Sequence, residues 1–178
     1  MKKMLFLLTI VFLMGSKSTI IEKDFLKAKI QEEDILLGKQ NRESLTKAPY
    51  RSWFTSRYDT YDVDKEMLKT LTPLLKGIKV TIFMGTWCED SKRETPHFYK
   101  IADATGLKDK NITLITMSQS KDTPEKYEKG LNITNVPTFI FYKNGKEINR
   151  IVEYPMESLE KDMVAILSGK AYKHAYSD

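Results

Sequence analysis

The chain has 178 residues, of which 41% are hydrophobic and 30% charged, and its formal net charge is +5. That length is typical of one domain with short additions and is sufficient to bury a substantial core. Residues 1–18 hold three of the 29 basic residues and no acidic one, so the remaining chain has a net charge of +2 and lacks the basic stripe of a nucleic-acid-binding protein.

The N-terminus has the pattern of an export signal. Lys2 and Lys3 precede a mostly apolar run at 4–14, and small and polar residues follow it. The run has the length of a signal-peptide core and is shorter than the ~20 residues of a membrane-spanning helix. We therefore expect residues 1–18 to be a signal peptide and the protein to be exported, periplasmic or secreted, with no stable membrane insertion after cleavage. A short buried helix is the alternative.

Residues 19–64 are predicted to be an N-terminal helical and aromatic extension. Apolar residues recur at helical intervals over 20–37, which predicts an amphipathic helix. Five aromatic residues then fall within twelve positions: Tyr50, Trp53, Phe54, Tyr58 and Tyr61. We expect them to form a packed collar over the edge of a sheet. The other hypothesis is that some of them line a groove beside the only cysteine, Cys88.

Residues 65–170 show alternating strand and helix patterns. A helix capped by Asp64 should run towards Lys76, with Pro73 kinking or interrupting it. The remaining helices are expected at 88–105, 124–130 and 156–167, and the strands at 79–84, 112–117, 138–142 and 147–152.

The order of these elements predicts the architecture. A strand-helix-strand unit favours parallel pairing, and Asn144-Gly145 indicates a hairpin between the last two strands. The sum is an α/β fold with a central mixed sheet flanked by helices, followed by a polar tail at 171–178.

The stretch 80–96, VTIFMGTWCEDSKRETP, places Cys88 where a strand gives way to a helix. A cysteine at a helix N-terminus lies near unpaired backbone N–H groups and the positive end of the helix dipole, and both favour the thiolate. With no second cysteine, an internal disulfide is excluded. One cysteine and the distant His97 and His174 also give no basis for a structural zinc site, and no other metal or cofactor is indicated.

Two separated motifs resemble the thioredoxin superfamily. The residues that match its WCGPCK pattern and the helix-kinking proline that follows are Trp87, Cys88, Lys92 and Pro96. Glu89 and Asp90 replace the Gly-Pro pair, and Ser91 replaces the second cysteine. The stretch 135–146, NVPTFIFYKNGK, is similar to the family's segment in which a cis-proline faces the cysteine and leads into a strand and hairpin.

The resemblance implies a thioredoxin-like fold and a role for each matched residue. Cys88 would be the nucleophile, and Trp87 would contact the substrate beside it. The peptide bond between Val136 and Pro137 would be cis, and the Val136 backbone would pair with an extended substrate. Where the family commonly carries a buried acid, six positions before the cysteine, this chain has Ile82.

Residues near Cys88 should modulate its thiol. The Ser91 hydroxyl and the Lys92 ammonium would favour the thiolate, whereas Glu89 and Asp90 would oppose it, so we expect a modest net effect. His97 falls on roughly the opposite helix face and is not expected to act as a base.

Because Ser91 cannot attack a mixed disulfide, the pattern predicts monothiol exchange on protein or small-molecule disulfides, with an external thiol as the reductant. The alternative is a non-redox, chaperone-like binding module in which the proline groove holds extended chains and Cys88 is incidental.

Overall fold

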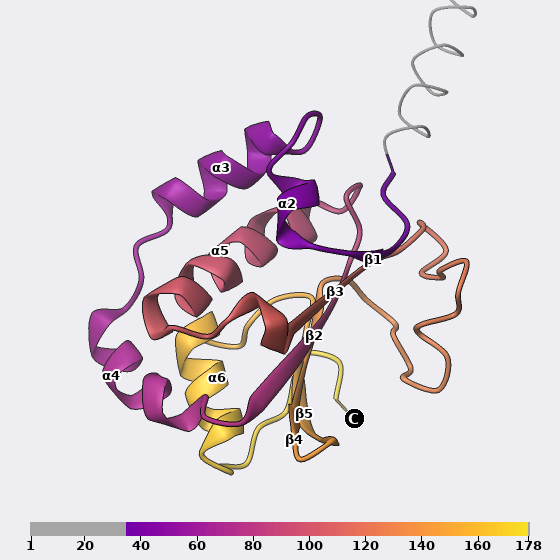
Figure 1. The fold of residues 1–178 in the computed structure, drawn as a ribbon. Coiled ribbons are helices and arrows are strands. Elements are labelled where there is room, and N and C mark those ends of the chain that lie inside the picture. Colours follow the sequence, from indigo (N-terminus) through magenta and orange to yellow (C-terminus); the bar gives the residue numbers. More distant parts are fainter. Residues whose placement is uncertain (1–34, 178) are drawn as a thin grey trace, which may run out of the picture. The chain divides into compact units, whose positions relative to one another are not determined.

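The computed structural model describes residues 35–177, which form a five-stranded sheet with helices packed against it (Figure 1). The strands are β1 (Gly38–Gln40), β2 (Ile78–Met84), β3 (Ile112–Thr116), β4 (Thr138–Lys143) and β5 (Lys146–Val152). Their order is β1-β3-β2-β4-β5, with β2 and β3 parallel and the other neighbours antiparallel. The predicted α/β fold with a central mixed sheet and flanking helices is confirmed.

The described residues form five α-helices and one short 3-10 helix. They are α2 (Arg42–Leu45), α3 (Arg51–Thr60), α4 (Lys65–Leu74), α5 (Glu89–Thr105), α6 (Leu159–Leu167) and the 3-10 turn Asp109–Asn111. The predicted signal peptide at 1–18 and residues 20–34 of the predicted helix lie outside the described part of the chain.

Local signals set several element boundaries. The Asp64 carboxylate accepts hydrogen bonds from the N–H groups of Glu66 and Met67, each at 3.0 Å, and so caps α4. Pro73 does interrupt this helix, which ends one residue later. Asn144 and Gly145 have φ angles of 52° and 77°, as a two-residue hairpin turn requires.

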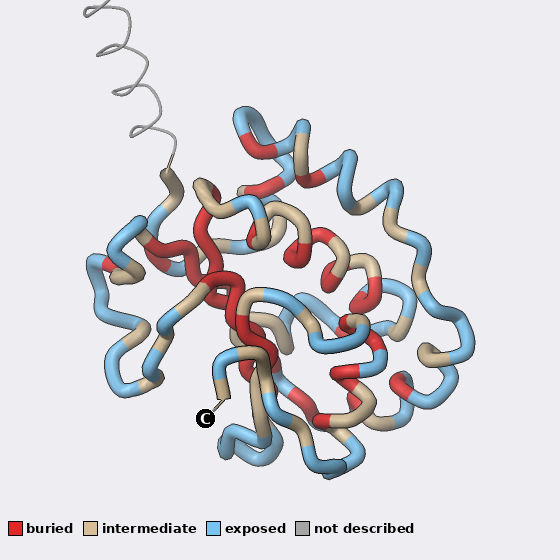
Figure 2. Tube along the Cα trace, turned by 180° about the vertical axis from the view of Figure 1, so that it is seen from behind, coloured by how far each residue is buried: buried red, intermediate tan, exposed pale blue. Residues whose placement is uncertain are grey.

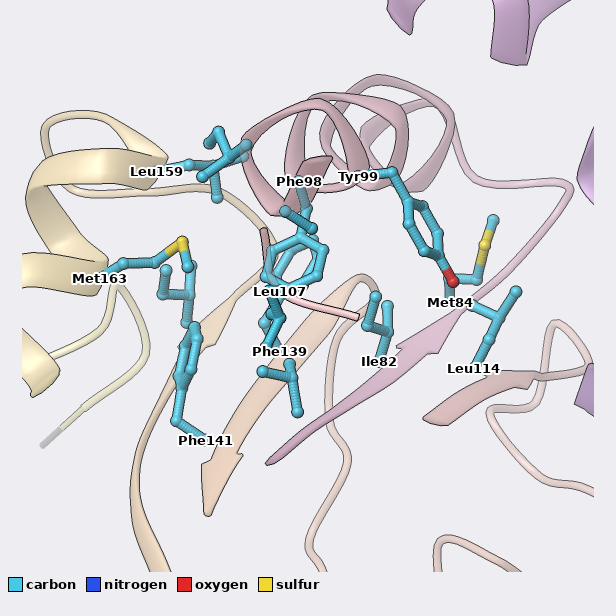
Figure 3. Packing of buried hydrophobic residues seen from close by; sticks show 14 of the residues in the cluster. Ile82, Met84, Phe98, Tyr99, Leu107, Leu114, Phe139, Phe141, Leu159 and Met163 are labelled. Carbon is cyan, nitrogen blue, oxygen red and sulfur yellow. The ribbon is translucent and has the colours of Figure 1, made fainter. Parts of the chain in front are cut away.

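The main core lies between the sheet and helices α4, α5 and α6. Figure 3 shows its packing between the strands and helices α5 and α6. Alternate strand residues such as Ile82, Met84 and Phe139 point to this face and are fully buried. Phe98 of α5 stacks on Phe139 of β4 with ring centroids 5.1 Å apart. Burial is concentrated on the central strands and the inner helix face (Figure 2). This packing fixes α5, and with it the residue at its N-terminus, relative to the strands.

A second, smaller apolar cluster combines the opposite set of strand side chains with residues from the adjoining loops. Its buried members are Phe83, Ile115, Met117, Val136 and Ile140. Leu131 and Ile133, from the segment between β3 and β4, are partly buried against it. Trp87 and Cys88 also pack on this cluster, so these two residues of the predicted site rest on buried apolar side chains.

The start of the described chain differs from the prediction of a helix reaching Leu37. Residues 35–37 are not helical, and they lead into β1, which pairs antiparallel with β3. Leu36 N–H donates to the Thr86 hydroxyl at 3.3 Å, which holds the chain extended at this point. Residues from 36 onward belong to one compact unit that includes the sheet.

The aromatic residues at 50–61 cover a helix rather than the edge of a sheet. Phe54 lies 6.0 Å from Tyr99 of α5, centroid to centroid, and 6.3 Å from Tyr58. Tyr50 and Phe54 are buried in the main core, and the other three aromatics pack against it. The expected collar therefore exists, but its partner is α5, because α3 runs alongside that helix (Figure 1).

Two helix predictions need correction. Residues 124–130 form turns, because Lys126 at φ 57° and Gly130 at φ 78° leave the right-handed helical region. The closing helix begins at Leu159 after the cap Ser158, and not at Met156. Met156 is 55% exposed, and its N–H donates to the buried Asp162 carboxylate at 2.6 Å, which holds the preceding loop outside the helix.

Candidate active site

Cys88 is the N-cap residue of α5 and follows the turn that leaves β2. Its N–H donates to the Gly85 carbonyl at 3.0 Å, and its own carbonyl accepts from Lys92 N–H at 3.0 Å. These bonds make the turn and begin the helix. The residue is half-buried, and its position as the cap places the thiol at the helix N-terminus.

The Cys88 thiol faces the loop that precedes β4. Its Sγ donates a hydrogen bond to the Val136 carbonyl oxygen at 3.1 Å. The peptide bond between Val136 and Pro137 is cis. Thr138 Oγ1 donates to the Asn135 carbonyl at 2.6 Å, and Glu153 N–H donates to the Pro137 carbonyl at 2.7 Å. The loop opposite the thiol is therefore held from two sides.

Trp87 is held close to the turn. Its Nε1 donates to the Met117 carbonyl at 2.9 Å, and its indole lies over Gly85. A Cβ added at Gly85 would come within 2.4 Å of Trp87 Cε2, so the glycine makes this close approach possible. The half-buried ring shares the second apolar cluster with Cys88.

Ser91 supports the turn instead of contacting the thiol. It is fully buried, and its Oγ accepts a hydrogen bond from Gly85 N–H at 3.2 Å. Among the described residues, no hydrogen bond joins the Ser91 hydroxyl to the Cys88 sulphur. Ser91, which replaces the second cysteine of the family pattern, therefore bonds to the turn before the helix.

The charges of the first turn of α5 are paired within the helix. Lys92 Nζ lies 2.7 Å from Glu89 Oε1, and this hydrogen bond lowers the pKa of Glu89. Arg93 Nη2 lies 2.5 Å from Asp90 Oδ1. Each carboxylate near the thiol is therefore balanced by a cation three positions later. Sequence reasoning missed Arg93, although its spacing from Asp90 was the available signal.

The comparisons with known proteins agree with this geometry. A family model described as Thioredoxin matches residues 39–168. The chain belongs to the thioredoxin family.

Several curated relatives align with about half of the chain. It is 29% identical over 89 residues to a thioredoxin-like protein of Acanthamoeba polyphaga mimivirus, covering 50% of this chain and 62% of that protein. It is 31% identical over 85 residues to a thioredoxin of Staphylococcus epidermidis, and this match covers 47% of this chain and 76% of that thioredoxin. The chain thus spans less than two thirds of the mimivirus relative's length.

Among solved structures, a Pseudomonas aeruginosa protein of unknown function superposes with a TM-score of 0.57. The match covers 75% of this chain and 94% of that one at 13% identity, which shows a shared fold.

This member of the thioredoxin family departs from the family pattern in its core. Ile82 is fully buried among apolar side chains, where the family commonly has an acid.

His97 stacks on Tyr61 with ring centroids 4.1 Å apart, and its Nδ1 lies 3.7 Å from the buried Glu94 carboxylate. Among the described residues, no group of His, Cys, Asp and Glu could hold a metal, and no helix is long and apolar enough to cross a membrane.

The structure brings together some of the predicted site residues and separates others. Cys88 contacts Val136, which is joined to Pro137 by the cis peptide bond, and Trp87 packs on the same apolar cluster. Ser91 and Lys92 have partners other than the thiol. The predicted aromatic cluster belongs to the main core, whereas Cys88 packs on the second apolar cluster; its members are Tyr50, Trp53, Phe54, Tyr58 and Tyr61. Glu153, which binds the Pro137 carbonyl, was not predicted from the sequence.

Proposed function

We propose that this protein carries out thiol-disulfide exchange through Cys88 alone. The observation that carries the proposal is the 3.1 Å hydrogen bond from Cys88 Sγ to the Val136 carbonyl. It places the thiol at the N-terminus of α5 and opposite the loop that precedes β4. A helix N-terminus favours the thiolate, which is the attacking form. The protein's membership of the thioredoxin family supports the same chemistry.

The exchange begins when the Cys88 thiol releases its proton to solvent. The thiolate attacks one sulphur of a substrate disulfide, a new S–S bond forms, and the other substrate sulphur leaves as a thiolate. An external thiol, as its thiolate, then attacks the mixed disulfide and forms an S–S bond with the substrate sulphur. Cys88 leaves as a thiolate. The external thiol is required because Ser91 has no sulphur to attack with.

The Val136 carbonyl would bind the substrate in this scheme. It accepts from the Cys88 S–H, and that hydrogen bond is lost when the thiol ionises. The oxygen is then free to accept a backbone N–H from an extended substrate chain. Trp87 would border the bound chain, since it packs on the same apolar cluster as Cys88.

We further propose that the protein acts outside the cytoplasm, exported by residues 1–18. Disulfide substrates are abundant in such compartments. The cleavage of these residues is tested by N-terminal sequencing of the protein recovered from the expressing cell. An intact N-terminus would contradict the proposal.

The test of the function is the rate of alkylation of Cys88 against pH, with Cys88→Ser as the blank. We expect fast alkylation at neutral pH, and a mixed disulfide that forms with a peptide disulfide and is released by added thiol. A thiol that scarcely reacts would instead favour the non-redox binding module, in which the loop holds extended chains. Ser91→Cys is the second variant: its new thiol should release the peptide without added reductant.

A further inference from the structure

Glu153 has a backbone conformation that a glutamate adopts at a cost. Its φ is 68°, in the left-handed region that disfavours residues with a Cβ. Tyr154 N–H donates to the Val152 carbonyl at 2.9 Å, which makes a three-residue turn centred on Glu153. Glycine would adopt this turn without strain. A side chain kept in such a conformation is a reason to look for a role.

The Glu153 side chain connects two distant segments. Its Oε2 accepts from Asn135 Nδ2 at 3.2 Å, in the loop that carries Val136. The same oxygen accepts from the Tyr176 hydroxyl in the C-terminal tail. The backbone N–H of Glu153 donates to the Pro137 carbonyl at 2.7 Å. Glu153 thus binds the loop on both sides of Val136.

The C-terminal tail is itself anchored. The Tyr172 hydroxyl donates to the buried Asp162 carboxylate at 2.7 Å, and the Tyr172 carbonyl accepts from Asn149 Nδ2 at 3.1 Å. The Tyr176 ring packs edge-on against Tyr154, with centroids 6.3 Å apart. The tail therefore presents the Tyr176 hydroxyl to Glu153 from a fixed position.

Among the described residues, the other non-glycine residues with positive φ make no side-chain hydrogen bond to residues 135–137. They are Lys121, Lys126, Asn132 and Asn144. Lys126, for example, pairs with the nearby Asp122 at 3.0 Å. Asn144 is exposed in the hairpin turn, where asparagine is the usual residue. Among the described residues, only Glu153 combines a strained backbone with side-chain contacts to the loop opposite Cys88.

We propose that Glu153 is a positioning residue for substrate binding, and that Tyr176 holds its carboxylate in place. By fixing Asn135 and the Pro137 carbonyl, Glu153 sets the direction of the Val136 carbonyl that receives the substrate backbone. This inference rests on the proposed exchange function. It requires that substitution of Glu153 slows the reaction of Cys88 with a disulfide that has a peptide backbone and has little effect on the reaction with a disulfide that has none.

The experiment compares two disulfides that release the same chromophore. One is a short peptide whose single cysteine carries thionitrobenzoate, and the other is dithiobis(nitrobenzoate) itself. In each case the Cys88 thiolate forms a mixed disulfide and expels thionitrobenzoate. The readout is the ratio of the two second-order rate constants, measured together with the urea midpoint of unfolding.

Glu153→Gly removes the carboxylate and relieves the backbone strain. We expect the peptide-to-small-disulfide rate ratio to fall about fivefold, the effect of losing roughly one hydrogen bond, while the unfolding midpoint stays equal or rises. Glu153→Gln keeps an acceptor oxygen and should retain most of the ratio. Tyr176→Phe should lower it by less than Glu153→Gly. Asn144→Gly is the matched control at another positive-φ site, with an unchanged ratio.

Three outcomes would overturn the proposal. An unchanged ratio in Glu153→Gly would show that the carboxylate does not position the loop. A ratio that falls as far in Glu153→Gln would show that the acceptor is not what matters. A parallel fall of both rates and of the unfolding midpoint would mean a purely structural role. If wild type reacts with neither disulfide, the exchange function fails and takes this inference with it, whereas reaction with an unchanged ratio removes only the inference.

Discussion

The Cys88 sulphur lies 3.1 Å from the Val136 carbonyl oxygen although 48 residues separate the two. Their meeting follows from the sheet register. β2 and β4 are antiparallel neighbours, with Phe83 opposite Thr138. The residues just after β2 and just before β4 therefore emerge at the same edge of the sheet. The thiol and the loop that faces it are placed by backbone pairing, so variants of the surrounding side chains can test their roles one at a time.

The first prediction concerns the charge balance around Cys88. Lys92→Gln removes the hydrogen-bonded cation of Glu89, so more of the negative charge of Glu89 opposes the thiolate. We expect alkylation of Cys88 at neutral pH to slow about two- to threefold, since ion pairs near the surface contribute less than about 1 kcal/mol. Glu89→Gln should accelerate the reaction by a similar factor. High salt should reduce both effects.

A suitable control for this prediction is Lys161→Gln. Lys161 of α6 pairs at 3.1 Å with Glu157, which precedes the helix, and both are far along the chain from Cys88. Its removal should leave the alkylation rate unchanged. Equal rates in wild type, Lys92→Gln and Glu89→Gln would show that these charges do not influence the thiol.

Much of the fold could be predicted because its signals are local. Apolar runs mark β2 and β3, Asn144-Gly145 marks the hairpin, and α5 ends at the expected residue 105, where Gly106 follows at φ 75°. These residues encode strand, turn and helix end through their own backbone preferences. The position of Cys88 at the start of α5 follows from the same local rules.

The rest depends on contacts between distant residues. β1 has only three residues and is stabilised by its pairing with β3. A segment this short has no periodic pattern from which the strand could be predicted. The hydrogen bond from Gly85 to Ser91 redirects a side chain that spacing alone aims at the thiol. The contacts of Glu153 join segments 18 and 23 residues away. Tertiary context decides such interactions, and a single sequence does not display it.

The second prediction separates the structural role of Ser91 from a catalytic one. Ser91→Ala leaves the buried Gly85 N–H without an acceptor, which should lower the free energy of unfolding by about 1–3 kcal/mol. The alkylation rate of folded Cys88 should stay within about twofold of wild type, because the hydroxyl does not contact the sulphur. Urea unfolding and alkylation kinetics measure the two quantities. Ser168→Ala, at an exposed serine, is the matched control. A large loss of reactivity at unchanged stability would contradict this assignment.

The third prediction tests the aromatic residues of α3. Phe54 is 4% exposed and packs between α3 and α5. Phe54→Ala should lower the free energy of unfolding by about 3–5 kcal/mol, and the milder Phe54→Leu by about 1 kcal/mol. The Phe54→Leu protein should exchange disulfides at the wild-type rate, because Phe54 belongs to the main core and not to the thiol site. Slower exchange at normal stability would instead support an aromatic groove beside Cys88.

The last prediction is a pH dependence of stability that originates at Glu94. This residue is 6% exposed, and Arg93 Nε donates to its Oε1 at 2.7 Å. Burial by itself raises the pKa of Glu94, but the interactions with His97 and Arg93 outweigh it and bring the pKa below the usual 4.5. Because the folded state binds this proton more weakly than the unfolded state does, the ionised carboxylate stabilises the fold above about pH 4.5.

The stabilisation should therefore be lost as the pH falls through the folded-state pKa of Glu94. Glu94→Gln should unfold more easily than wild type at about pH 7, by about 1–3 kcal/mol, because Arg93 loses a charged partner. The difference should shrink at about pH 3, where the wild-type carboxyl also takes up a proton. Urea unfolding at both pH values measures it. Glu157→Gln, at an exposed glutamate, serves as the control with a small effect. A difference that stays constant or grows on acidification would show that Glu94 is not the group responsible.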